Sequence, residues 1–162
     1  MLKHLTVLLA FLMTLSSPLA AQDLKKGYAA YSAGDYATAL QEWKPLAEAG
    51  DTFGQFMLGL LYFNGFGVVQ DYKETVKLWT VAAKQGNATA QGNLGLRYEN
   101  GQGVLQDNAM AHMWYNIGSA NGFEQSGTNR DQIAKIMTNA DISKAQAMAR
   151  ECMSSNYKNC GH

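Results

Sequence analysis

The sequence predicts an all-α protein, a short right-handed α/α solenoid of helix-turn-helix repeats with about three to four helix pairs. Gly50, Gly86 and Gly122 lie 36 residues apart, and residues 51–86 share twelve identities with residues 87–122. Apolar residues within each unit recur at helical spacing, and aspartates stand where helices would begin. Units of this kind stack on one another, because a single unit cannot bury its apolar face alone.

The chain begins with a segment typical of a secretory signal peptide, residues 1–21. Lys3 provides the positive charge, residues 5–15 form the apolar stretch, and cleavage is expected after Ala20 or Ala21. A retained membrane anchor is the alternative, but a helix that spans a bilayer needs about 20 apolar residues, and this stretch is shorter. We therefore expect an exported protein, periplasmic or secreted, without a membrane span in its mature chain.

The repeat period divides the rest of the chain into four segments. These are an N-terminal capping half-repeat at residues 22–50, repeats at 51–86 and 87–122, and a C-terminal helical cap with a disulfide-pinned tail at 123–162. Residues of the half-repeat match residues 36 positions later at Asp35, Tyr36, Trp43, Ala47 and Gly50. This segment resembles a repeat without its usual first helix, and residues 23–33 would stand in for that helix.

Each repeat is expected to consist of a helix, a loop, a second helix and a turn. Asp35, Asp71 and Asp107 would cap the second helices, because a carboxylate accepts hydrogen bonds from free N–H groups in the first turn. Glu74 stands three residues after Asp71 and would complete a capping box with it.

Glycines are expected to end the helices and to bring them close together. The Asn-Gly pairs at 64–65 and 100–101 would end the first helices with glycine in the left-handed conformation, and Gly86 would end a second helix in the same way. Gly59 and Gly95 fall inside helices, where glycine costs about 1 kcal/mol relative to alanine. Their recurrence indicates a close approach of the second helix.

Two further features concern the ends of this helical array. Pro45 falls late in the helix expected after Asp35 and should kink its last turn. Residues 126–137 form a candidate helix, and Thr138 would cap another that runs to about Ser155.

The two cysteines, Cys152 and Cys160, are expected to form a disulfide, because export leads to an oxidising compartment. Seven residues separate them, and this is not the spacing of a redox-active CxxC motif. The bridge would pin the C-terminal tail.

Composition excludes several classes of protein. The chain has 13 basic and 13 acidic side chains and is 47% apolar, and this balance argues against disorder. A neutral chain also lacks the basic character of nucleic-acid-binding proteins, so no nucleic-acid partner is expected. The sequence does not determine the oligomeric state.

The chemistry-bearing residues form no convincing catalytic or metal site. His112 occupies the position of Val76 in the preceding repeat, which predicts a structural histidine inside the fold. Met110, His112 and Met113 include soft ligands that could suit Cu(I), but positions 110 and 113 share a helix side that 112 does not. Ser155 stands three residues before Lys158, as in penicillin-recognising enzymes, without their companion motifs. No metal and no cofactor are expected.

The repeats carry the pattern A-x-x-x-L-G-x-x-Y-x-x-G-x-G-V-x-x-D. It is complete at Ala90, Leu94, Gly95, Tyr98, Gly101, Gly103, Val104 and Asp107. This pattern and the 36-residue period resemble the Sel1-like repeat family, a relative of the tetratricopeptide repeat. The resemblance implies an α-solenoid that acts as an adaptor or scaffold, and the tail resembles the C-terminal cap of exported bacterial members.

One apolar stripe, on the helix at residues 54–63, could bind a partner. In the helix at residues 54–63, Phe56, Leu60 and Phe63 lie opposite the side that carries the motif, so this helix is apolar all round. Packing between repeats is one explanation, and a groove on the concave face for a helix or an extended peptide is the other. The candidate partner-binding residues, including the equivalent positions in the next repeat, are Phe56, Leu60, Phe63, Leu96, Arg97 and Glu99.

Two functional hypotheses follow. The first is an exported, non-catalytic module that binds a protein or peptide partner on its concave face. The alternative is a hydrolase that acts on cell-wall or β-lactam substrates, supported by the Ser155 motif and by loose analogy.

Overall fold

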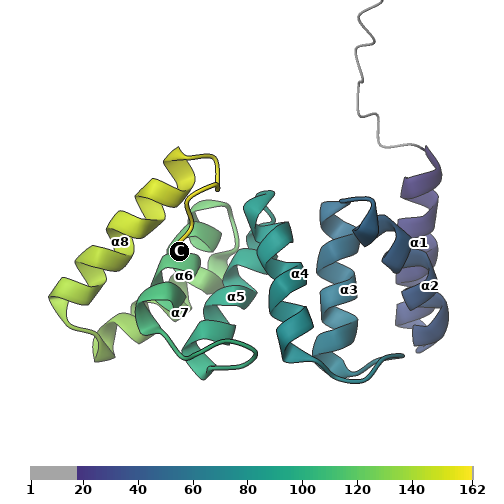
Figure 1. Ribbon diagram of the computed structural model, residues 1–162, viewed down its shortest axis with the longest axis horizontal. Coiled ribbons are helices and arrows are strands. Elements are labelled where there is room, and N and C mark those ends of the chain that lie inside the picture. The colour runs from purple at the N-terminus through teal and green to yellow at the C-terminus, as the bar shows by residue number, and fades with distance from the viewer. Residues whose placement is uncertain (1–17, 162) are drawn as a thin grey trace, which may run out of the picture.

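The structure, a computed structural model, describes residues 18–161 and is helical throughout, with no strand among these residues (Figure 1). The predicted signal peptide falls mostly on residues 1–17, which lie outside the described residues. In chain order, the elements are α1 (Pro18–Ser32), α2 (Tyr36–Glu48), α3 (Thr52–Asn64), α4 (Tyr72–Lys84), α5 (Ala88–Asn100), α6 (Asn108–Ala120), α7 (Glu124–Ile133), the 3₁₀ turn η1 (Ala134–Ile136) and α8 (Asn139–Ser154).

Consecutive helices pack against each other from α1 to α7, and the last helix, α8, packs against α6. The helix pairs follow one another along the long axis of the molecule, with α1 and α2 at one end and α8 at the other (Figure 1). This arrangement confirms the predicted all-α solenoid of helix pairs. The buried cores lie between neighbouring helices along the row rather than at a single centre.

The predicted aspartate caps are confirmed at the start of each second helix. Asp35 accepts a hydrogen bond from the Thr38 N–H, and Asp71 and Asp107 each accept two from their own first turns. The capping box, however, is not closed. The Asp71 N–H already donates to the Tyr62 carbonyl, and Glu74 pairs with Lys77 instead.

The predicted glycine helix ends are also present. Gly65 and Gly101 are left-handed caps of α3 and α5, with φ of 70° and 64°. Gly86 has a φ of 89°, but it lies one residue beyond the cap of α4, which is Gln85. At all three positions a side chain would strain the backbone.

Glycines inside the first helices let the large aromatic residues of the second helices approach. A Cβ atom on Gly59 would lie 2.5 Å from Trp79 Nε1, and one on Gly95 would lie 2.5 Å from Tyr115 Cδ1. Both positions therefore confirm the predicted close approach. The same contact occurs in the first pair, where a Cβ atom on Gly27 would lie 2.3 Å from Trp43 Nε1.

The α1 helix is thus built like the other first helices, but its residues align with those of α3 at a spacing other than 36 residues. Trp43 Nε1 donates to the Leu24 carbonyl at 3.5 Å, as Trp79 Nε1 donates to the Phe56 carbonyl at 3.1 Å. Leu24 therefore corresponds to Phe56, which lies 32 residues later rather than 36. The loop between α1 and α2 is four residues shorter than the loop between α3 and α4.

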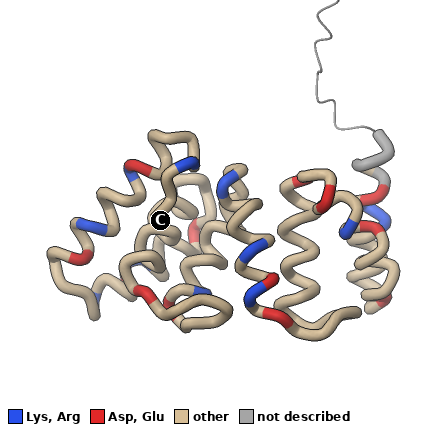
Figure 2. The backbone as a smooth tube through the Cα atoms, in the orientation of Figure 1, with Lys and Arg blue, Asp and Glu red and all other residues tan. Residues whose placement is uncertain are grey.

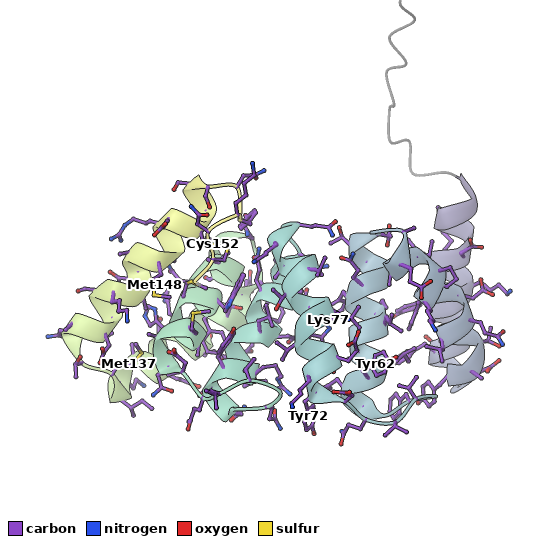
Figure 3. The ribbon with its side chains drawn as sticks, viewed as in Figure 1. Tyr62, Tyr72, Lys77, Met137, Met148 and Cys152 are labelled. Carbon is purple, nitrogen blue, oxygen red and sulfur yellow. A yellow bond between two sulfur atoms is a disulfide. The ribbon has the colours of Figure 1, made fainter. Side chains whose placement is uncertain are left out.

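The C-terminal region closes the row of helices. The helix predicted at residues 126–137 is α7, which begins at Glu124 and gives way to η1, while Thr138 caps α8 as predicted. Cys152 and Cys160 form the expected disulfide, and both are buried. Cys152 is labelled on α8 in Figure 3. Pro45 lies within the last turn of α2, which continues to Glu48.

Candidate partner-binding face

The first helices α1, α3 and α5 together present one face of the solenoid, which we call the first-helix face. On α3 this face carries the exposed Phe53 and the half-buried Phe56, Leu60 and Phe63. Leu24 and Tyr28 occupy the positions of Phe56 and Leu60 on α1. The α3 helix contains no charged residue, and its tube is tan along its length in Figure 2.

Phe56, Leu60 and Phe63 also contribute to packing, because all three lie against the buried core. The Phe56 and Phe63 rings lie 5.9 and 5.7 Å from the ring of Trp79, measured between centroids. Phe56, Leu60 and Phe63 are all half-buried. The packing explanation therefore holds for the inner edges of these side chains, while their outer edges remain accessible.

The face is most open between α1 and α3. Tyr28 is 56% exposed and Phe53 is 41% exposed, although both are large aromatic residues. A hollow with a cavity volume of about 490 Å³ is lined by Ala21, Leu24, Lys25, Tyr28, Ala29 and Phe53.

The hollow does not follow from the 36-residue period, because α1 does not align with the other first helices at that spacing. The number of residues between Gly27 and Trp43 in the sequence is the signal that could have placed α1 among the first helices. When Gly27 is aligned with Gly59, Leu24 and Tyr28 take the positions of Phe56 and Leu60. The apolar stripe therefore extends toward the N-terminus.

The seam between α3 and α5 holds Arg97, which the sequence analysis placed among the candidate residues. Its guanidinium lies over the Phe63 ring, 4.4 Å from the ring centroid. Arg97 is only 4% exposed, and its Nε and Nη1 atoms have no hydrogen-bond partner among the described residues. Burial lowers the pKa of the guanidinium, and the nearby Tyr72 and Tyr115 hydroxyls oppose that shift. Tyr72 is labelled at the start of α4 in Figure 3.

The remaining candidates on α5 are Leu96 and Glu99, both half-buried. The Tyr115 hydroxyl donates a hydrogen bond to Glu99 Oε2. Burial and this carboxylate raise the pKa of Tyr115 well above its usual value. One oxygen of Glu99 is therefore engaged within the fold, and no ion pair forms between Glu99 and Arg97 in the described part of the chain.

The family model that matches the chain is the Sel1 repeat, at residues 52–87 and 88–123. The chain carries two Sel1 repeats. Each match covers one helix pair, α3 with α4 and α5 with α6. No curated protein matches the chain significantly.

Solved structures of Sel1-repeat proteins resemble this chain. One is c5321, described as a protective antigen of uropathogenic Escherichia coli with an SLR fold. It has 25% identity and a TM-score of 0.79 over 85% of this chain and 31% of that protein. Another is a Sel1 repeat protein from Oxalobacter formigenes, with 30% identity and a TM-score of 0.62 over 74% of this chain and 51% of that protein. The chain thus spans about a third of one relative and half of the other.

The histidine and the methionines that could have served as metal ligands are buried inside this Sel1-repeat chain. His112 is 2% exposed, and burial lowers its pKa, with Arg130 adding to the shift. Met110 and Met113 are buried. Within residues 18–161, no group of three or more His, Cys, Asp or Glu residues could hold a metal ion.

The hydrolase alternative gains no support from the structure. The Ser155 hydroxyl donates to the Cys152 carbonyl at 2.9 Å and accepts from the Asn159 N–H at 2.9 Å. It therefore bridges the turn inside the disulfide loop.

None of the described helices is long and apolar enough to cross a membrane.

Proposed function

We propose that this Sel1-repeat chain is an exported, non-catalytic adaptor that binds a protein or peptide partner on its first-helix face. Sel1 repeats generally mediate protein interactions. The observation that carries the proposal is the hollow between α1 and α3, with Tyr28 and Phe53 exposed at its rim. Exposed aromatic side chains around an apolar depression are typical of a docking surface.

The proposed surface runs from this hollow across α3 to α5. It comprises the newly found Tyr28 and Phe53 together with the residues proposed from the sequence, Phe56, Leu60, Phe63, Leu96, Arg97 and Glu99. Because so few helix pairs contribute, a single helix or an extended peptide fits this surface better than a large domain.

Export is part of the proposal. The buried Cys152–Cys160 disulfide suits an oxidising compartment, and residues 1–21 have the composition of a signal peptide. Expression of the full chain with a C-terminal tag, followed by measurement of its intact mass, tests this part. We expect a product that begins at residue 21 or 22 in the exported fraction. Such cleavage removes at most Ala21 from the lining of the hollow, and Leu24, Tyr28 and Phe53 remain.

Partner capture from the exported fraction of the source organism tests the binding surface. The bait is the tagged full chain, and the test variant carries Tyr28→Asp and Phe53→Asp, two changes at exposed positions. A matched control carries Val69→Asp and Leu105→Asp, because these side chains are 88% and 90% exposed and lie in loops away from the hollow.

We expect a partner that the parent and the loop variant retain and the face variant loses, with unchanged helical circular dichroism. The Leu60→Asp and Phe63→Asp double variant separates binding from packing. Loss of the partner with intact folding supports the surface on α3, whereas unfolding shows that these side chains serve packing. A partner retained by the folded face variants would contradict the proposal.

A further inference from the structure

The seam between α3 and α5 differs from the preceding seam at two equivalent positions. In the preceding repeat, the position of Arg97 is occupied by Leu61, which is fully buried. The position of Gln102 is occupied by Phe66, whose ring stacks on Tyr36 with a centroid separation of 4.1 Å. At these two positions the apolar residues of the preceding repeat are replaced by polar ones, and a cation stands where the same architecture accepts a leucine.

This cation has no anionic partner in the described part of the chain. None of the ion pairs there involves Arg97, and the Tyr115 hydroxyl engages the Glu99 carboxylate. The Phe63 ring covers one face of the guanidinium, and an aromatic face compensates a buried cation only in part. Two buried nitrogen atoms remain without acceptors, and such a defect is costly unless a ligand or another group supplies the acceptor.

We propose that Arg97 receives a carboxylate of the bound partner, so that the first-helix face selects an apolar peptide that carries an acidic group. This inference rests on the proposed function and names the chemistry of its partner. A carboxylate offers two oxygens that can accept from a guanidinium. Phe63 is half-buried and covers one face of the Arg97 guanidinium, so the carboxylate would meet the guanidinium beside this ring.

The fold contributes a second argument for this chemistry. Lys25 lines the hollow between α1 and α3, and Arg97 lies in the next seam along the same face. Across α1, α3 and α5 the face therefore has a cation at each seam, with the uncharged α3 between them (Figure 2). A peptide that crosses α3 would place its apolar residues on Phe56 and Leu60 and its acidic group at Arg97.

The test is a selection from a random peptide library displayed with free C-termini, carried out on the full chain and on the Arg97→Leu variant. Leucine is the residue of the preceding repeat, so this variant should fold and should melt several degrees higher than the parent. We expect peptides selected on the parent to combine apolar residues with an acidic group at a constant distance. Their affinity should fall at least tenfold on Arg97→Leu.

Two peptide changes identify the source of the carboxylate. In one peptide the acidic side chain is replaced by its amide, and in another the C-terminus is amidated. The change that removes the carboxylate bound by Arg97 should weaken binding to the parent but not to Arg97→Leu. Arg97→Lys keeps the charge and loses the planar fork, so it should retain part of the affinity. It also serves as the second variant if Arg97→Leu fails to fold.

The outcomes separate the inference from the proposed function. Selected peptides that lack an acidic group, or that bind Arg97→Leu as tightly as the parent, overturn the inference and leave the binding face intact. Peptides that bind but are unaffected by Tyr28→Asp overturn the assignment to this face. A library without any enriched peptide counts against the proposed function and the inference together.

Discussion

The close contact between Gly59 and Trp79 makes Gly59→Ala the sharpest test of how the helix pairs are held together. A Cβ atom there would lie 2.5 Å from Trp79 Nε1 and 2.6 Å from Trp79 Cδ1, well inside contact distance. The indole cannot move freely, because Trp79 is 2% exposed and its Nε1 donates to the Phe56 carbonyl.

Three contributions set the expected change in the free energy of unfolding. Overpacking a core position costs roughly 1–3 kcal/mol, and loss of the indole hydrogen bond adds about 1 kcal/mol. Alanine returns about 1 kcal/mol, because it is the better helix former. We therefore expect Gly59→Ala to lower the free energy of unfolding by about 1–3 kcal/mol in urea denaturation.

The Gly127→Ala variant is the matched control. Its added Cβ atom meets the Ser119 Oγ at 3.0 Å, and this small side chain can rotate away. The control should be neutral or more stable by up to about 1 kcal/mol. If Gly59→Ala proves as stable as the parent, the indole does not fill the space that glycine leaves, and the explanation of the recurring glycines is wrong.

Three further predictions concern stability. Asp107→Ala removes an N-cap that accepts two hydrogen bonds and should cost about 1 kcal/mol in urea denaturation, whereas a loss below about 0.3 kcal/mol would show that the cap contributes little. Replacement of Cys152 and Cys160 by serine should cost about 2.5 kcal/mol, the loop-closure value for a bridge with a separation of 8 residues, and a reductant should then leave the melting temperature unchanged. Burial lowers the pKa of His112, so the unfolded chain binds its proton more readily; stability should be full above about pH 6.5 and fall as the pH drops below it. A slope between pH 7 and 5 that persists in His112→Gln would assign this loss to other groups.

Much of the fold could be predicted from the sequence, because the determinants are local or periodic. The aspartate caps depend on residues three positions apart, and the left-handed glycines on a conformation that few other residues adopt. The capping box at Asp71 was predicted wrongly, since the Asp71 N–H is occupied by the Tyr62 carbonyl nine residues earlier. A local motif cannot show that a more distant acceptor is already present.

The candidate site was harder to predict because it depends on contacts between repeats. The period identifies Arg97 as the equivalent of Leu61, but not that its guanidinium rests on Phe63 of the neighbouring helix. Nor could a fixed period of 36 residues align α1, whose loop to α2 is shorter. Tyr28, the most exposed aromatic residue of the face, was therefore missed.

The most direct test of the binding face is a map of peptide contacts by NMR. A peptide selected on the parent chain is titrated into the isotopically labelled protein, and the amide chemical-shift changes are located on the structure. The proposal predicts that the changes concentrate on α1, α3 and α5, around Tyr28, Phe53 and Arg97. Changes concentrated instead on the second helices α2, α4 and α6 would contradict it.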